Sequence, residues 1–321
     1  MKAIGKEKAL EMLRQMLVCR RFEEGCLKAY QQKLITGFCH TYIGQEAVGI
    51  GTINHLIKGV DSFVTSYRCH AQGLIAGMDP KEMMAEMFGR ITGCVRGKGG
   101  SMHVFSKEYN FLGGHGIVGG QIPIGIGGAF ASKYKGDGGI GLIYFGDGAS
   151  MQGTFHESVN LAALWDIPAI FICENNRYGM GTATNRALSN PDLADQAAGY
   201  GIKGYTINGL DTVEVYTKMG EIIKEVRETS RPVIVDMKTY RFKGHSVSDA
   251  GLYRSKDEVK EYMDKDCLIK FKNDMIEADY ISEDEYAVLD KEIKKEMKEV
   301  YAYAENAPWP PMDELEKHVF A

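Results

Sequence analysis

Two short apolar runs, each followed by a polar turn, constrain the fold of this chain more than any other feature. The run GLIYF (141–145) leads into a Gly-Asp-Gly turn at 146–148, and the run AIFIC (169–173) leads into an asparagine pair at 175–176. The residues between the two runs predict an amphipathic helix that ends before a proline. The apolar face of this predicted helix consists of Phe155, Val159, Ala162 and Ala163, and Pro168 follows it. A strand, a helix and a strand within about 30 residues form a βαβ unit, so we expect parallel strands.

The same alternation extends through the middle of the chain. Further strand-like runs are SFVTS (62–66) and PVIVDMKT (232–239). Alternating strands and helices over about 60–240 predict an α/β fold with a mostly parallel sheet and helices on both faces. Residues 1–60 and 256–321 lack strand patterns, and the latter are rich in Lys, Glu and Asp. We therefore expect one domain over the whole chain, with a helical N-terminal extension and a charged helical C-terminal extension.

Composition excludes several classes of function. A net charge of -5 argues against a nucleic-acid-binding face. No apolar run approaches the ~20 residues that cross a membrane. The seven cysteines form no Cys-x-x-Cys pair, which is typical of reduced thiols in a cytosolic type of compartment. The first residues, MKAIGKEKALEMLRQM, resemble neither a signal sequence nor a transit peptide. We expect a cytoplasmic protein, or a mitochondrial matrix protein only if a transit peptide has been removed.

The polar ends of the two apolar runs predict a metal site. Asp147 and Asn176 are 29 residues apart and would both lie at the carboxyl edge of the sheet, where ligands bind in open α/β folds. Their hard oxygens suit Mg²⁺, which usually bridges protein oxygens to phosphates. Gly146 and Gly148 allow the backbone to approach an anion. The alternative is that Asp147 only caps a helix and that the asparagine pair is an ordinary turn, but the spacing favours a metal-diphosphate site.

Several segments resemble a known family. GDGASMQG, ENNRYGMGT and YRFKGHSVSD are similar to the alpha subunit of the pyruvate dehydrogenase decarboxylase component, in the thiamin-diphosphate-dependent 2-oxo acid dehydrogenase family. The similarity runs from RRFEEGCLKAY (20–30) through FCHTYIGQEAVGIG (38–51) to about Arg254. It implies a thiamin-diphosphate-binding fold, thiamin diphosphate and Mg²⁺ as cofactors, and oxidative decarboxylation of pyruvate with acetyl transfer to a lipoyl domain. The implied partners are a beta subunit in an α₂β₂ heterotetramer, a lipoyl transacetylase core and a small-molecule 2-oxo acid. The cofactor-activating glutamate would come from the beta subunit.

The resemblance also implies roles for individual residues. Mg²⁺ would be bound by the side chains of Asp147 and Asn176 and by the backbone carbonyl of Tyr178. The other implied cofactor contacts are Tyr67, Arg68, Ser106, Gly116, Val118, Gly148, Ala149 and His245. His245, His40 on the substrate side and His70 near Arg68 are the candidate catalytic groups, because a histidine with a near-neutral pKa can transfer protons. Four other histidines are expected to be structural: His55, His103, His156 and His318.

Other functions stay open. The segment GHGIVG (114–119) matches the G-x-G-x-x-G dinucleotide fingerprint, so a nicotinamide-dependent dehydrogenase is a distant alternative. No apolar strand is predicted before it, and glycines stand about 20 residues later where that fingerprint expects an acidic residue. Within the resembled family, branched-chain 2-oxo acid and acetoin dehydrogenases are alternatives, although RYGMGT (177–182) and Gln121 resemble the pyruvate type. A noncatalytic homologue is a third alternative, which the intact site residues argue against.

The segment FKGHSVSDAGLYRSK (242–256) predicts a mobile surface loop, because it is rich in glycine, serine and charge and has almost no apolar residues. By resemblance, Ser246 occupies the position that regulatory kinases phosphorylate in eukaryotic relatives. The alternative is an unmodified loop serine.

Overall fold

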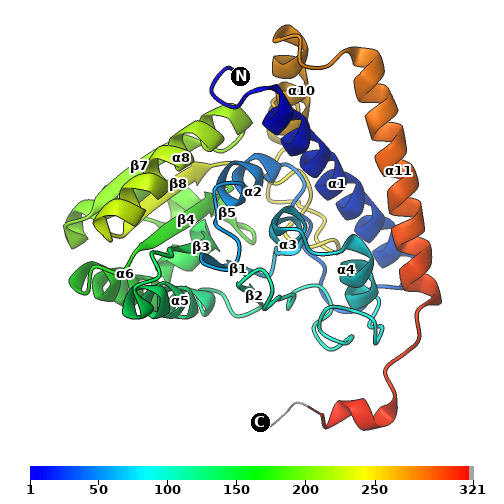
Figure 1. Ribbon diagram of the computed structural model, residues 1–321, viewed down its shortest axis with the longest axis horizontal. Coiled ribbons are helices and arrows are strands. Elements are labelled where there is room, and N and C mark those ends of the chain that lie inside the picture. Colours follow the sequence, from blue (N-terminus) through cyan, green and yellow to red (C-terminus); the bar gives the residue numbers. More distant parts are fainter. Residues whose placement is uncertain (318–321) are drawn as a thin grey trace.

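A six-stranded parallel sheet forms the centre of the molecule (Figure 1). The computed structural model describes residues 1–317, so His318 and the end of the expected C-terminal extension lie outside the described residues. The strands are β1 (Ser62–Ser66), β2 (Phe111–His115), β3 (Gly141–Gly146), β4 (Ala169–Asn175), β7 (Lys203–Asn208) and β8 (Val233–Lys238). Their order is β2-β1-β3-β4-β8-β7, and neighbouring strands pair in parallel. The predicted α/β fold is confirmed.

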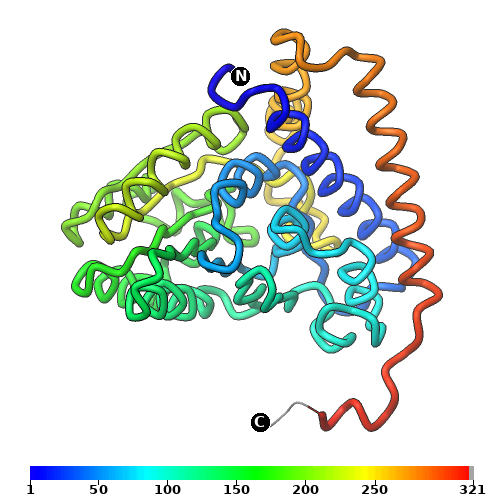
Figure 2. The backbone as a smooth tube through the Cα atoms, viewed as in Figure 1, coloured from blue at the N-terminus to red at the C-terminus, as the bar shows by residue number. Residues whose placement is uncertain are grey.

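Side-chain alternation along the strands divides the core into two layers. In β3, Leu142 and Tyr144 pack into one hydrophobic cluster, whereas Ile143 and Phe145 pack into the other. The first cluster contains side chains of α1 (Lys6–Gln31), α2 (Glu46–Ile53), α3 (His70–Ala76), α4 (Pro80–Met87) and α8 (Thr212–Thr229), and the second contains side chains of α5 (Gln121–Lys135) and α6 (Gly153–Leu164). Helices therefore cover both faces of the sheet, as Figures 1 and 2 show.

The predicted βαβ unit is β3, α6 and β4. Phe155, Val159 and Ala162 are buried on the inner face of α6, and Ala163 lies beside them at the edge of that face. A short 3-10 turn, η1 (Asp147–Met151), separates β3 from α6. The crossover therefore follows the sequence pattern, and it delivers the Gly-Asp-Gly turn and the asparagine pair to the same edge of the sheet.

The structure corrects the expectation that no strand precedes the segment 114–119. Strand β2 has the sequence FLGGH, and its two glycines interrupt the run of apolar residues by which a buried strand is recognised. Gly114 is needed there, since an added Cβ would lie 2.5 Å from the sulfur of Cys69 and 2.7 Å from the carbonyl oxygen of Met102. The turn that follows β2 leads into α5, so the segment forms a strand-turn-helix unit.

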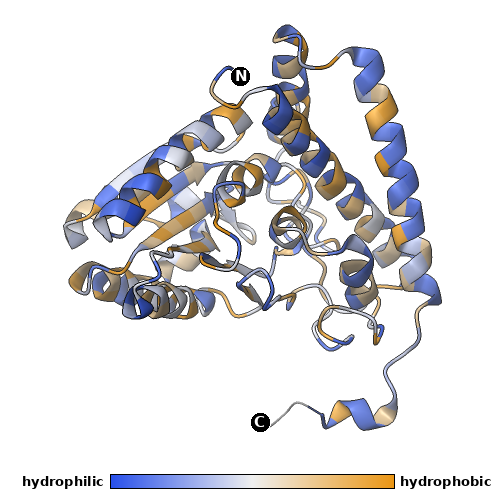
Figure 3. Ribbon diagram, in the orientation of Figure 1, coloured by the Kyte–Doolittle hydropathy of each residue, from blue (hydrophilic) through white to orange (hydrophobic). Residues whose placement is uncertain are grey.

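The two terminal extensions pack against each other. The charged helices predicted after residue 256 are α9 (Lys256–Met263), α10 (Cys267–Glu277) and α11 (Glu283–Asn306). Helix α11 runs beside α1 and is largely hydrophilic on the side that Figure 3 shows. The guanidinium of Arg20 in α1 bonds to Glu46 of α2 at 2.5 Å and to Asp266, before α10, at 2.8 Å. This largely buried triad ties the two extensions to each other.

The segment that follows β8 is held by polar contacts. The carboxylate of Asp249 accepts hydrogen bonds from the backbone N–H of His245 at 2.6 Å and from the hydroxyl of Tyr253 at 2.7 Å. Arg254 donates to the carbonyl oxygen of Arg241 at 2.7 Å. The sequence pattern did not reveal these polar contacts, nor the packing of Phe242 and Val247 against the core.

The remaining expectations from composition concern thiols and membranes. All seven cysteines are free thiols, and six of them are buried. Within residues 1–317, none of the helices combines the length and the apolar character needed to cross a bilayer.

Candidate functional site

A cavity of about 710 Å³ opens at the carboxyl ends of β1, β2, β3 and β4. This edge is where ligands bind in open α/β sheets. The sequence-predicted residues that line it are His40, Tyr67, Arg68, Gly116, Val118, Asp147, Gly148, Ala149, Asn176, Tyr178 and His245. The structure thus gathers nearly all of the predicted site residues around one hollow, although they come from segments throughout the sheet domain.

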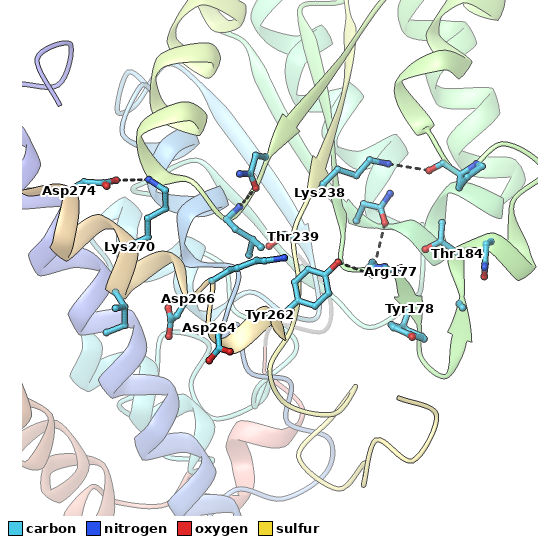
Figure 4. A pocket seen from close by; sticks show the side chains of 18 of the residues that line it. Arg177, Tyr178, Thr184, Lys238, Thr239, Tyr262, Asp264, Asp266, Lys270 and Asp274 are labelled. Atoms are coloured by element: carbon cyan, nitrogen blue, oxygen red, sulfur yellow. Dashed lines mark hydrogen bonds and ion pairs between the residues drawn. The ribbon is translucent and has the colours of Figure 1, made fainter. Parts of the chain in front are cut away.

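A second pocket, of about 1130 Å³, lies further along the same edge, beyond β4, β8 and β7 (Figure 4). Most of its charged side chains already have partners within the protein. Lys270 pairs with Asp274 at 2.7 Å, and Arg177 donates to the hydroxyl of Tyr262 at 2.7 Å. Of the predicted site residues, only Tyr178 lines this pocket. The smaller cavity is therefore the candidate functional site.

The three predicted metal ligands come from adjacent segments of the cavity wall. Asp147 begins η1 after β3, Asn176 follows β4, and Tyr178 begins β5 (Tyr178–Gly179). One guanidinium nitrogen of Arg241, Nη1, donates to Asn176 Oδ1 and to the carbonyl oxygen of Tyr178, both at 2.6 Å. These two oxygens therefore converge on a single cationic nitrogen. A carboxylate, a carboxamide oxygen and a main-chain carbonyl are hard donors of the kind that Mg²⁺ prefers, so the residues fit a magnesium site.

The segments that carry these donors are in direct contact. A Cβ added to Gly148 would lie 3.2 Å from the Cα of Gly179, so glycine permits this close approach. Thr184 donates to Asp147 Oδ2 at 3.3 Å. Burial raises the pKa of Asp147 from the ordinary value of 3.8 to about 6, although the positive charge of Arg241 opposes this rise. A carboxylate held at such a cost in the core would gain strongly from a bound cation.

Two histidines and a tyrosine form an aromatic cluster in the cavity wall. The ring centroids of His40 and Tyr67 are 4.3 Å apart, and those of His40 and His245 are 5.2 Å apart. Burial, reinforced by the charge of Arg68, lowers the pKa of His40 to about 2 and that of His245 to about 4. Both imidazoles are therefore neutral near pH 7. Neither Nδ1 atom has a hydrogen-bond partner among the residues that the structure describes.

The buried guanidinium of Arg68 joins two walls of the cavity. It donates to the carbonyl oxygen of Thr41, before α2, and to that of His245 at 2.9 Å. The planar guanidinium also suits recognition of phosphate oxygens. Arg68 therefore combines a structural contact to the loop after β8 with a charge that an anionic ligand would need.

His70 does not line the cavity. It is fully buried, with Nδ1 at 3.0 Å from a carboxylate oxygen of Glu23 and Nε2 at 3.0 Å from the hydroxyl of Ser101. Glu23, Cys26 and His70 could hold a metal ion by distance, since their ligand atoms lie within 4.8 Å of one another, but His70 and Glu23 are already hydrogen-bonded. The candidate catalytic role of His70 lacks support from its position, because both ring nitrogens face protein groups beneath the cavity.

Ser106 also lies outside the cavity wall. Its backbone N–H and carbonyl pair with those of Phe111 at the start of β2, at 3.1 and 2.9 Å. The intervening residues form a turn that carries Ser106 away from the other predicted cofactor contacts. The implied contact of Ser106 with a cofactor therefore has no geometric support.

Sequence reasoning missed three charged residues in the cavity wall, Arg241, Glu174 and Asp249. Glu174 accepts hydrogen bonds from the hydroxyl of Tyr42 and from Gln72 Nε2, the latter at 3.2 Å, and burial raises its pKa to about 7. The sequence could have indicated Glu174 and Arg241 by their positions, because both are charged residues at the carboxyl edge of the sheet. Glu174 is near the end of β4, and Arg241 is three residues after β8.

Comparison with known proteins identifies the family. Residues 14–313 match the family described as "Dehydrogenase E1 component". The "Pyruvate dehydrogenase E1 component subunit alpha" of Rickettsia bellii is 45% identical over 315 residues, which cover 98% of this chain and 96% of that protein. The protein of the same name from Zymomonas mobilis is 47% identical over 311 residues, or 97% of this chain and 88% of that protein. A testis-specific mitochondrial form from Rattus norvegicus is 41% identical over 319 residues, or 99% and 80%.

The chain belongs to the dehydrogenase E1 component family. The resemblance found in the sequence motifs is thereby confirmed, and membership of this family implies thiamin diphosphate as the cofactor.

Proposed function

We propose that this chain is the alpha subunit of a thiamin-diphosphate-dependent enzyme that decarboxylates pyruvate oxidatively and passes the acetyl group to a lipoyl domain. The relatives named above support the substrate. The observation that carries the proposal is the convergence of the predicted metal donors on one side of a cavity that also holds Arg68 and two neutral histidines.

The residues of the cavity form groups, each of which would bind a different part of the cofactor. Asp147, Asn176 and the carbonyl of Tyr178 would hold Mg²⁺, while Tyr67, Arg68 and His245 would hold the diphosphate. Backbone groups of Gly116 and Val118 would meet the aminopyrimidine, and the backbone at Gly148 and Ala149 would complete the wall. Thiamin diphosphate, when bound, supplies the nucleophilic carbon and the electron sink for decarboxylation.

The chain's own contribution is binding, orientation and proton control. The neutral imidazole of His40 can donate a hydrogen bond from one nitrogen to an oxygen that gains negative charge. His245 can serve the same cavity from the loop after β8, and its position is fixed by the bond from Arg68 to its carbonyl oxygen. The rings of His40, Tyr67 and His245 pack together and make this wall of the cavity largely aromatic.

A beta subunit would complete the site. The names of the relatives describe an alpha subunit of a pyruvate dehydrogenase component, which implies such a partner. We propose an α₂β₂ heterotetramer in which the beta subunit supplies the activating carboxylate, and which docks on a lipoyl transacetylase core in the cytoplasm.

The alternatives are less well supported. No relative named above is a branched-chain 2-oxo acid or acetoin dehydrogenase. The segment 114–119 does follow a strand, but Gly116 and Val118 line the same cavity as the metal donors. The acidic residue about 20 residues later, Asp137, is exposed after the end of α5 and does not line that cavity. These positions favour one shared cofactor site over a separate nicotinamide site.

The test is a substrate panel with a binding assay. The chain is purified together with its beta subunit, and oxidation of pyruvate, 2-oxoisovalerate and acetoin is followed with an artificial electron acceptor. We expect pyruvate to be preferred and Arg68→Ala to weaken thiamin diphosphate binding in calorimetry, whereas Lys270→Ala in the second pocket should leave the affinity unchanged. Failure to bind thiamin diphosphate, or a preference for another substrate, would overturn the proposal.

A further inference from the structure

A buried arginine, Arg241, is hydrogen-bonded to two of the three predicted metal ligands. The side chain of Arg241 is 1% exposed, and its Nη1 donates to Asn176 Oδ1 and to the Tyr178 carbonyl, both at 2.6 Å. Its other terminal nitrogen, Nη2, donates to the carbonyl of Met180 and to the hydroxyl of Tyr253, both at 2.7 Å. Four hydrogen bonds thus fix the guanidinium between the metal-donor segment and the loop after β8.

All four hydrogen-bond acceptors of this guanidinium are neutral oxygens. An arginine in a protein stays protonated. Within residues 1–317, no carboxylate lies within 4.0 Å of the guanidinium of Arg241, but its charge opposes the rise in the pKa of Asp147 and contributes to the lowered pKa of Asp249. Among these protein groups, the single negative charge of the predicted metal donors, on Asp147, is therefore opposed by a fixed positive charge.

We propose that Arg241 makes binding of the divalent metal depend on the diphosphate. The inference rests on the proposed function, because it concerns the magnesium-diphosphate site described above. A bare divalent cation that approaches Asn176 Oδ1 and the Tyr178 carbonyl meets the guanidinium already bonded to both, and like charges at this range repel strongly away from bulk water. The diphosphate brings the negative charge that offsets both cations.

Arg241 is accordingly a positioning residue. It orients the two neutral donor oxygens, and its charge excludes metal that arrives without the anion. A purely structural arginine would also hold the donor segment, but it would give no dependence of metal affinity on the charge at position 241. Comparison of neutral and charged substitutions separates these two roles.

The experiment uses Mn²⁺ as the probe and electron paramagnetic resonance as the readout of free metal. The full chain, purified with its beta subunit and stripped of cofactor and metal, is titrated with Mn²⁺ alone and with thiamin diphosphate present. We expect weak binding of Mn²⁺ alone and much tighter binding with thiamin diphosphate. Arg241→Gln should bind Mn²⁺ alone about tenfold more tightly than the unsubstituted protein, while Arg241→Lys should not.

Arg177→Gln is the matched control. Arg177 belongs to the same segment, but its side chain points to Tyr262 in the second pocket, as Figure 4 shows, so its loss should leave Mn²⁺ affinity unchanged. Equal affinities of the Gln and Lys variants at position 241 for Mn²⁺ alone would overturn the inference.

Unsubstituted protein that binds Mn²⁺ equally well with and without thiamin diphosphate would also overturn it, whether or not the variants fold. If thiamin diphosphate itself does not bind the unsubstituted protein, the proposed function fails and this inference fails with it. If thiamin diphosphate promotes Mn²⁺ binding but the charge at position 241 has no effect, only this inference fails.

Discussion

Replacement of Asp147 by asparagine should stabilise the cofactor-free protein while it weakens cofactor binding. Asp147 is 4% exposed, and burial raises its pKa from 3.8 to about 6. A rise of this size means that keeping the carboxylate ionised in the folded state costs about 3 kcal/mol at neutral pH. Asparagine removes that cost and still offers an oxygen to the hydroxyl of Thr184. It also removes the only carboxylate among the predicted metal donors.

The sign of the pH dependence follows from the raised pKa. Below about pH 4 the carboxyl group is protonated in both folded and unfolded states, so it carries no penalty. As the pH rises from about 4 to 6, the unfolded state releases its proton first, and the folded state loses stability. The free energy of unfolding of Asp147→Asn should exceed that of the unsubstituted protein by about 1.5 kcal/mol at pH 5 and about 3 kcal/mol at pH 7.5.

The assay is urea denaturation of the metal-free protein at both pH values, with calorimetry of thiamin diphosphate and Mg²⁺ on the same samples. Glu157→Gln is a suitable control, because Glu157 is an exposed acid on α6 and should show no such difference. The reasoning is refuted if Asp147→Asn is less stable than the unsubstituted protein at pH 7.5, or if it binds magnesium and cofactor with unchanged affinity.

Three further outcomes are expected. The isolated chain should lack decarboxylase activity and gain it only when the beta subunit is added; robust turnover without the partner would contradict this. Ser246→Glu should lower the activity of the reconstituted enzyme by at least about tenfold and raise protease sensitivity at 241–254, because it places a negative charge beside the carboxylate of Asp249 and the wall proposed to bind the diphosphate; full activity with unchanged proteolysis would exclude it. Glu86→Ala should destabilise the protein by more than about 3 kcal/mol and speed hydrogen exchange of the loop 95–100, since the carboxylate accepts four backbone N–H bonds there; unchanged exchange would rule this out.

The sheet and one half of the site were predictable because their signals are local. Strands β3 and β4 are buried on both faces, so their sequences are continuous apolar runs that stand out from the chain. Asp147 and Asn176 were predictable because a polar residue directly after such a run must lie at the carboxyl edge. The parallel orientation of β3 and β4 then follows from the length of the connection between them.

Other features depend on contacts between distant segments, which a local pattern does not contain. Strand β2 was missed because close packing against Cys69 and Met102 selects glycine there, and glycine weakens the strand pattern. The burial of His70 results from Glu23, 47 residues earlier, and Ser101, 31 residues later. Neither partner could be assigned before the fold was known.

The position of Arg241 gives the clearest physical reason why metal and loop should be coupled. One end of its side chain bonds to the donor oxygens at Asn176 and Tyr178, while its own carbonyl accepts a bond from Arg254 in the loop after β8. Metal binding that displaces the guanidinium should therefore also disturb the hydrogen bonds of its other nitrogen, Nη2, to the hydroxyl of Tyr253 and the carbonyl of Met180. In the sequence analysis, His245 was the one residue of this loop that the resemblance implied as a cofactor contact. We expect Arg241 to provide a second connection between the cofactor site and the loop, and because it carries a charge, this connection should respond to the metal as well as to the diphosphate.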